Sequence, residues 1–211
     1  MPPVRPHPTL TDAEVEAQGG FVERLADDGA SAFLIAIAPH GGWIERFTDM
    51  QAERLRDALA SVGASSWLCR GHRPGGGTYA RFHVPSTAID EASFPLLGRV
   101  LGRGFAHAVA FHGHDVPGVL IGGSAPGAQK LAVKAALDAA LAGAGVAVRV
   151  AGASSRHAGG SPRNIVNRLA PGGGLQIEQC MRARQSHGAV IADAVASVYL
   201  QLARSPGREG A

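Results

Sequence analysis

Two histidines and one glutamate have the types and spacing of a catalytic metal site. His40 ends an apolar segment and is followed by two glycines, with Glu45 five positions further on. His112 ends a second apolar segment and is also followed by a glycine. Two imidazoles and one carboxylate, with a fourth position open to water, are a ligand set of catalytic zinc sites. The sequence therefore predicts one Zn²⁺ ion held by His40, Glu45 and His112.

A simpler interpretation exists for each histidine taken alone. A histidine at the end of a strand can hydrogen-bond to nearby backbone without binding a metal. The two histidines stand in matching contexts, however, and one of them is followed by a suitably spaced glutamate. This combination favours the metal site.

Glu178 is the candidate general base. In Leu175-Gln176-Ile177-Glu178, strand alternation places Gln176 and Glu178 on the same face. A carboxylate that arrives at the end of a strand can take a proton from a water activated by zinc, whose pKa the metal lowers towards ~7. Without the other residues, an exposed glutamate at a strand end would be the simpler interpretation.

The segment from Ser161 to Arg168 is a candidate substrate-binding segment. Ser161 is expected to cap a helix and Pro162 to occupy its first position. Arginine can hold both oxygens of a carboxylate, and a helix N-terminus favours anions. A capped surface helix with solvated arginines remains an equally open alternative. The candidate substrate-binding residues are Arg163, Asn164, Asn167 and Arg168.

Other motifs point away from competing chemistries. The glycine clusters at 75–77 and 122–123 lack the Gly-Lys-Ser/Thr ending of a phosphate-binding loop, and no GxSxG segment marks a serine hydrolase. Two cysteines, Cys69 and Cys180, are too few for a disulfide scaffold and are interpreted as buried thiols. The remaining histidines considered are expected beside the site or on the surface: His114, His157 and His187.

The segments between these residues alternate between strand and helix patterns, which predicts an α/β fold. A mainly parallel or mixed sheet with helices on both faces is expected, with ligands bound beyond the carboxyl ends of the strands. The predicted strands are Ala32–Ala38, Ser66–Cys69, Arg81–Val84, His107–Phe111, Val116–Ile121, Val146–Val150 and Leu175–Glu178. The predicted helices are one that starts with a capping box at Thr48 and stops at Gly63, then Phe94–Leu101, Ala128–Leu141 and Gly188–Ala203.

The 211 residues fit one domain. Residues 1–10 are expected to form a flexible arm, residues 11–204 a single catalytic domain, and residues 205–211 a disordered tail. The chain has no apolar run long enough to span a bilayer and no signal-peptide pattern at its start, so we expect a cytoplasmic protein without a membrane partner. Lysis would release it if it is of phage origin.

The charge pattern indicates which kinds of molecule the protein is expected to bind. The formal net charge is +3, without the run of Lys and Arg that marks a nucleic-acid track, so no nucleic-acid partner is expected. A weakly positive field suits an anionic peptide or polymer as substrate. A monomer is favoured, although nothing in the pattern fixes the oligomeric state.

Four of the segments together resemble one family, the poly-γ-glutamate hydrolases. They are HGGWIE, the strand ending in FHG, SPRNIVNR and LQIE, and the resemblance runs from about Phe33 to the final helix. It implies a compact, zinc-carboxypeptidase-like single domain with the metal ligands and catalytic glutamate named above, and with the NIxNR segment beside the substrate cleft. One departure is Ala88, which stands where the family usually has histidine after Ser-Thr; it leaves the zinc set intact and bears on substrate preference.

The expected activity is therefore zinc-dependent hydrolysis of amide bonds, with γ-glutamyl bonds of poly-γ-glutamate as the first candidate. A carboxypeptidase-like amidase acting on another acidic peptide is the alternative among enzymes. A non-catalytic polyanion-binding protein is the alternative from another class, and it would keep the metal but cleave no amide. Glu178 argues against it, because binding alone needs no base beside an open metal position.

Overall fold

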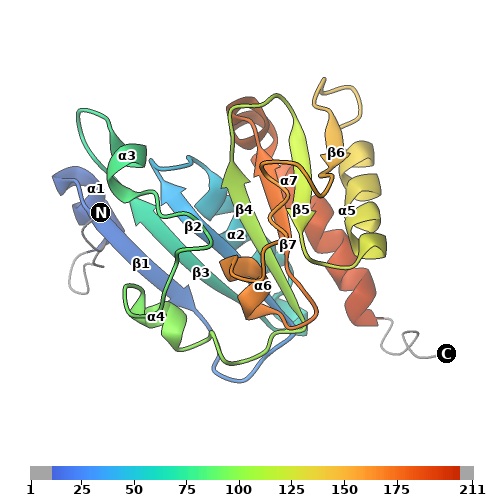
Figure 1. The fold of residues 1–211 in the computed structure, drawn as a ribbon, viewed down its shortest axis with the longest axis horizontal. Helices are drawn as coiled ribbons and strands as arrows, with labels where there is room; N and C mark the ends of the chain where they lie inside the picture. The colour runs from blue at the N-terminus through green and yellow to red at the C-terminus, as the bar shows by residue number, and fades with distance from the viewer. Residues whose placement is uncertain (1–10, 205–211) are drawn as a thin grey trace.

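The computed structural model describes residues 11–204 and contains one mixed sheet of seven strands with helices on both faces (Figure 1). The predicted fold class is confirmed. The expected N-terminal arm and C-terminal tail lie outside the described residues. No helix in the described part of the chain combines the length and apolarity needed to cross a membrane.

The sheet has the strand order β1-β3-β2-β4-β7-β5-β6. Its strands are β1 (Phe21–Ala26), β2 (Leu34–Gly42), β3 (Ala64–Gly71), β4 (His107–Gly113), β5 (Val119–Gly123), β6 (Val148–Val150) and β7 (Leu175–Gln179). The helices are α1 (Asp12–Gln18), α2 (Thr48–Ala58), α3 (Thr78–Phe82), α4 (Pro95–Gly98), α5 (Gly127–Ala140), α6 (Ile165–Leu169) and α7 (Met181–Arg204), with a 3₁₀ turn η1 at Ala60–Val62.

The middle of the sheet is parallel. β3, β2, β4 and β7 run in one direction, whereas β1 is antiparallel to β3 and β5 is antiparallel to β7. From β2 the chain passes to β3 on one side, and it returns to β4 on the other side of β2. The order of the strands therefore switches between β2 and β4, which is where open α/β sheets form their ligand crevice.

The alternation of side chains along β2 separates two cores. Leu34 and Ala36 belong to the core that α2, α5 and α7 cover, and Ile35 and Ile37 belong to the core that α3, α4 and α6 cover. All four side chains are fully buried. Because a central strand is covered on both faces, its sequence is an unbroken apolar run, as was predicted from Ala32–Ala38.

Three local predictions are wrong. Residues 81–84 were expected to form a strand, but the chain there ends helix α3 and places Phe82 in the second core. The capping box at Thr48 is absent: Phe47 is the N-cap residue in a left-handed conformation, and the Thr48 hydroxyl donates to the carbonyl oxygen of Glu45 at 2.9 Å. The cap expected at Ser161 is supplied by Asn164, whose side chain accepts from the backbone N–H of Val166.

The start of the chain and the start of α7 also differ from expectation. Helix α1 and strand β1 were not predicted, because the segment FVERLA carries charged residues and lacks an apolar run. Glu23 in β1 is nevertheless buried, and it accepts a hydrogen bond from the indole N–H of Trp67 at 2.8 Å. Helix α7 begins at Met181 and passes through Gly188, which was predicted as its start.

Candidate metal centre and cleft

The turn after β2 brings Glu45 back to His40. The Glu45 N–H donates to the carbonyl oxygen of His40 at 2.7 Å. A β-carbon on Gly41 would lie 2.6 Å from the β-carbon of Asp49, and Gly42 has a φ of +66°. The two glycines are thus required by close packing and by a left-handed backbone, respectively. The HGGWIE segment therefore fixes the separation of the two side chains.

The structure brings the three predicted ligands to one point. The Nδ1 atom of His40 lies 3.2 Å from Oε1 of Glu45 and 3.2 Å from Nδ1 of His112. The Nδ1 atom of His112 lies 3.3 Å from Oε2 of Glu45. Tetrahedral zinc with bonds of about 2.0–2.1 Å separates its ligand atoms by about 3.3 Å. The two Nδ1 atoms and the two oxygens of the Glu45 carboxylate therefore have spacings that fit the ligands of a single zinc ion.

The hydrogen bonds around the ligands also fit a cation. The Nε2 atom of His40 lies 2.7 Å from the carbonyl oxygen of Val84, so it must donate its proton there. In the neutral ring this leaves a lone pair on Nδ1, facing the carboxylate of Glu45 at 3.2 Å. Two acceptors at that distance repel each other unless a positive charge lies between them. An outer partner that fixes the tautomer in this way is typical of metal-binding histidines.

Glu45 is ionised within this cluster. Burial by itself raises the pKa of the Glu45 carboxyl, but the imidazoles of His40 and His112 outweigh it and hold the pKa well below its ordinary value. Burial lowers the pKa of His112, and the hydrogen bond and charge of Glu45 more than reverse this, so the pKa is raised. The carboxylate is therefore available as an anionic ligand, and protons on the imidazoles compete with a metal for the same atoms.

His83 lies beside the predicted ligands and was not predicted as one. The ligand atoms of His40, Glu45 and His83 lie within 4.8 Å of one another, and Nε2 of His83 is 3.7 Å from Oε1 of Glu45. The His83 ring stacks on Tyr79 at 4.3 Å and lies 4.1 Å from the His40 ring. The shorter separations favour His112 as the third ligand. His83 is not followed by a glycine, and the strand predicted for residues 81–84 does not form, so its place beside the ligands followed only from the fold.

Glu178 lies next to the ligands, in β7. It is the register partner of His112 in β4. Its Oε1 atom accepts a hydrogen bond from Nε2 of Gln176 at 2.6 Å, which confirms that these two side chains share a face. Within residues 11–204, no hydrogen bond reaches its Oε2 atom. Burial raises the pKa of Glu178 above its ordinary value despite the nearby His112. A buried carboxyl with a raised pKa and one unbonded oxygen can exchange a proton.

Asn164 acts on Glu178 through Gln176. The Nδ2 atom of Asn164 donates to Oε1 of Gln176 at 2.9 Å, and Gln176 in turn donates to Glu178. All three side chains are buried. This chain of hydrogen bonds orients the amide of Gln176 and hence the carboxyl of Glu178.

Asn167 and Arg168 bind parts of the chain itself. Asn167 donates to the carbonyl oxygens of Gly159 and Ser161, both at 2.8 Å. Arg168 donates to the carbonyl oxygen of Ile89 at 2.8 Å and pairs with Glu91 at 3.0 Å. These contacts stabilise the surrounding loops. A role for the two residues in substrate binding stays a prediction.

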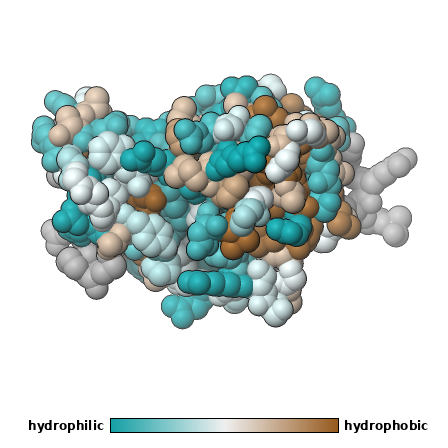
Figure 2. All heavy atoms as spheres, turned by 90° about the horizontal axis from the view of Figure 1, so that it is seen from above, coloured by the Kyte–Doolittle hydropathy of each residue, from teal (hydrophilic) through white to brown (hydrophobic). Residues whose placement is uncertain are grey.

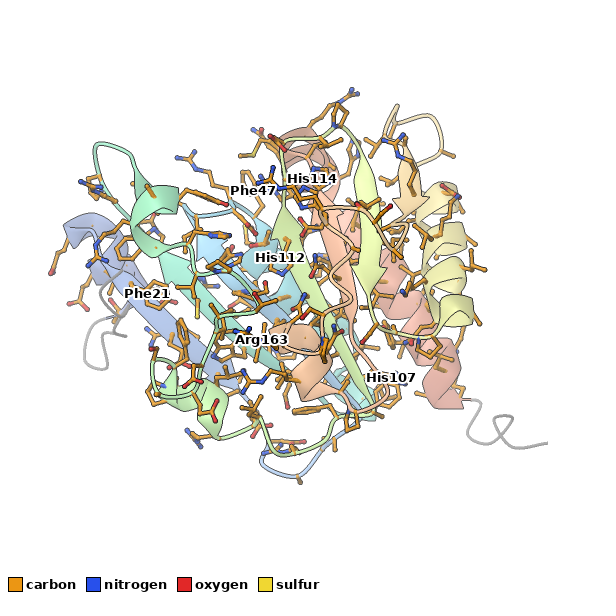
Figure 3. The ribbon with its side chains drawn as sticks, in the orientation of Figure 1. Phe21, Phe47, His107, His112, His114 and Arg163 are labelled. Atoms are coloured by element: carbon orange, nitrogen blue, oxygen red, sulfur yellow. The ribbon has the colours of Figure 1, made fainter. Side chains whose placement is uncertain are left out.

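Arg163 is exposed, and its place relative to the strand end is visible in Figure 3. That view draws His114 at the upper edge of the sheet, where β4 ends, with His112 below it and Arg163 lower still. Arg163 thus lies further from the carboxyl edge than the two histidines, and its predicted role in substrate binding stays a prediction.

A cavity of about 330 Å³ opens beside the metal centre at the carboxyl ends of the strands. His114 and His157 line it with their rings 5.4 Å apart, which agrees with their expected place beside the site. Figure 2 looks onto this end of the molecule and shows hydrophilic residues over much of the left half and hydrophobic residues gathered on the right half. The cavity is lined by Ile44, Glu45, Tyr79, Gly113, His114, Asp115, Arg156, His157 and Arg184.

The sequence and the fold of this chain both match known proteins. Residues 13–188 match the family described as Poly-gamma-glutamate hydrolase. The structure resembles a bacteriophage poly-gamma-glutamate hydrolase, with 24% identity and a TM-score of 0.68 over 86% of this chain and 89% of that one. It also resembles YNDL in a form described as apo and zinc-free, with 22% identity and a TM-score of 0.62 over 88% of this chain and 90% of that one. No curated protein matches the sequence.

Proposed function

The chain belongs to the poly-gamma-glutamate hydrolase family, and on this premise we propose that it is a zinc-dependent hydrolase of γ-glutamyl amide bonds. The observation that carries the proposal is the convergence of His40, Glu45 and His112, whose Nδ1 atoms and carboxylate oxygens lie 3.2 to 3.3 Å from one another across the three residues. These separations match those required by tetrahedral zinc. The site lies where the strand order switches, which is where this type of sheet binds ligands.

His40, Glu45 and His112 would hold the ion, and the hydrogen bond from His40 to Val84 keeps the ligand ring in the required tautomer. When bound, zinc supplies Lewis-acid chemistry that polarises the scissile carbonyl and makes water more acidic.

Glu178 is the proposed general base and acid. Its Oε2 atom takes a proton from the attacking water and returns a proton to the leaving amine, while Oε1 stays hydrogen-bonded to Gln176. Gln176, held in turn by Asn164, fixes the orientation of the carboxyl.

The proposed substrate is an anionic polymer or peptide. Arg156 and Arg184 line the cavity beside the metal centre and carry positive charge into it. Asp115 lines the same cavity and contributes a negative charge, so the electrostatic attraction of an anionic substrate depends on which of these groups it contacts. Each residue of a γ-glutamyl chain carries one free carboxylate next to its amide bond, and arginine binds such groups well.

The proposal is tested by incubating the zinc-loaded protein with poly-γ-glutamate and with α-linked polyglutamate. We expect new amino termini and shorter chains from the γ-linked polymer, and neither after the zinc is removed with a chelator. Full activity in the chelated protein would contradict the role of zinc. Cleavage of the α-linked polymer alone would favour the amidase alternative. Retention of metal without cleavage of either polymer would favour a binding protein.

A further inference from the structure

Arg184 is a buried cation to which residues 11–204 offer no oxygen acceptor. It lies in the first turn of α7 with only 6% of its surface exposed. Its Nε and Nη1 atoms are buried and make no hydrogen bond to the described residues. Among the described residues, the one hydrogen-bond partner of its Nη2 atom is the thioether sulfur of Met181, at 3.8 Å. Sulfur is a weak acceptor, so the guanidinium keeps most of its hydrogen-bonding capacity unused.

The guanidinium lies in the wall of the cleft. Arg184 lines the same cavity as Glu45 and His157. A side chain at residue 113 would occupy the position of its Nη1 atom, so Gly113, directly after the ligand His112, leaves the room that the guanidinium fills. Met181 is 43% exposed, and its side chain can move aside for a better acceptor.

The buried positive charge of Arg184 lowers the stability of the protein when no ligand is bound. Burial lowers the pKa of Arg184, although an arginine stays protonated in proteins. Glu45 and Glu178 act on it electrostatically, but within residues 11–204 no carboxylate lies within ion-pair distance of its nitrogens. Buried charges are normally paired, because an unpaired one loses its hydration without compensation. The missing partner is therefore expected to be an anion that enters the cleft.

We infer that Arg184 binds the free α-carboxylate of the glutamyl residue next to the scissile bond and thereby selects γ-linked chains. The inference rests on the proposed function. In a γ-linked chain, the carbon bound to the amide nitrogen also carries a carboxylate. In an α-linked chain that carbon carries the next peptide carbonyl, and the carboxylate lies at the end of a side chain. A cation fixed beside the metal centre can separate these two patterns.

Kinetics of Arg184 variants test the inference. We compare zinc-loaded wild type, Arg184→Ala and Arg184→Lys on a γ-linked glutamyl oligomer and on the same oligomer with its α-carboxylates converted to carboxamides. On the free acid, Arg184→Ala should lower kcat/KM about 100-fold, as expected when one partner of a buried charge pair is removed. It should change kcat/KM on the carboxamide less than about threefold, and Arg184→Lys should recover part of the loss. Arg182→Ala is the matched control, because Arg182 is an exposed arginine of the same helix.

Binding gives a measurement that does not depend on cleavage. Glutarate, a dicarboxylate with the same number of carbons as glutamate, should bind the zinc-loaded wild type at least 10-fold more tightly than Arg184→Ala in a calorimetric titration. If the wild type cleaves no amide but shows this difference, the proposed function fails and carboxylate binding by Arg184 stands. If the wild type cleaves the γ-linked oligomer and Arg184→Ala loses the same factor on both substrates, the inference is wrong.

A purely structural role predicts other results. If Arg184 only balances the charges of Glu45 and Glu178, then Arg184→Ala should shift the pH profile of kcat/KM and affect both substrates equally, which would overturn the inference. If it only supports the fold, its removal should lower the melting temperature. We expect the melting temperature of Arg184→Ala to stay the same or rise, because the change removes an unpaired buried charge.

Discussion

His112 in β4 and Glu178 in β7 are direct register partners on adjacent parallel strands. His112 is a predicted metal ligand, and Glu178 is the predicted general base. Parallel pairing places both side chains at the same edge of the sheet, so the base lies beside the metal centre without any contribution from a mobile loop. The hydrogen bond from Gln176, at 2.6 Å, then fixes the carboxyl of Glu178.

Glu178→Gln should leave the metal centre intact and stop turnover. Glutamine has nearly the same shape but cannot take up a proton, so kcat should fall by about 10³-fold, within the range for loss of general acid–base catalysis. Zinc content and the KM for poly-γ-glutamate should change little. Steady-state kinetics and metal analysis of the purified variant check both statements. Glu16→Gln, an exposed position on α1, is the control. A Glu178→Gln variant with wild-type kcat would remove Glu178 from the mechanism.

His40→Ala and His112→Ala should lose zinc, whereas His83→Ala should keep it. Each of the first two removes a nitrogen that lies 3.2 to 3.3 Å from the other ligand atoms. The loss of affinity should exceed the factor of about 10–100 that is typical of residues that only orient a ligand. Zinc-to-protein ratios after dialysis against a weak chelator measure this. The opposite pattern, with zinc lost from His83→Ala and kept by His112→Ala, would exchange the roles of the two residues.

Gln51 and Gln179 form a reciprocal pair of buried hydrogen bonds between α2 and β7, of 2.8 and 2.9 Å. Gln179→Leu leaves the amide of Gln51 without these partners, which should lower the free energy of unfolding by about 1–3 kcal/mol. In the double variant with Gln51→Leu, both polar groups are gone, so the cost should be smaller than the sum of the two single costs. Urea unfolding of the four proteins in this cycle measures the difference. Additive costs would show that the pair does not act as a unit.

The ion pair between Asp27 and Arg103 should make the free energy of unfolding depend on pH in the acidic range. Burial raises the pKa of Asp27, but the bidentate contact with Arg103, at 2.6 and 2.8 Å, and the hydrogen bond from Ser65 outweigh it, so the pKa lies below its ordinary value. A folded-state pKa below the unfolded one adds stability that is complete above pH ~4 and is lost as the pH falls through the folded-state pKa.

Asp27→Asn should therefore destabilise the protein at pH 7 and progressively less below pH ~4. Chemical unfolding of the wild type and the variant across this range provides the comparison. Arg103→Gln is the companion variant: it removes the same ion pair and should weaken the acid dependence as well. A difference between wild type and Asp27→Asn that stays constant from pH 7 to pH 3 would show that the ionisation of Asp27 contributes nothing to stability.

The pattern of the sequence alone predicted the fold class and named His40, Glu45 and His112, which the fold brings together. Central strands such as β2 are covered on both faces, so their apolar runs stand out from the local sequence. His40 and Glu45 are linked by a short turn, and the glycines that the turn needs are visible as Gly41 and Gly42. Alternation along β7 also placed Gln176 and Glu178 on one face. These features depend on neighbours within a few residues.

Only the tertiary structure decided the contacts between distant segments. Strand β1, with its buried Glu23, is stable because Trp67 and α4 supply partners that FVERLA does not reveal. Asn164 became the helix cap and the support of Gln176, in place of the cap expected at Ser161. The cleft position of Arg184 depends on the pairing of β4 with β7 and on the missing side chain at Gly113. The local sequence pattern indicates which faces of a helix or strand are apolar. The hydrogen-bond partners of buried polar groups, in contrast, come from whichever segment the fold places beside them.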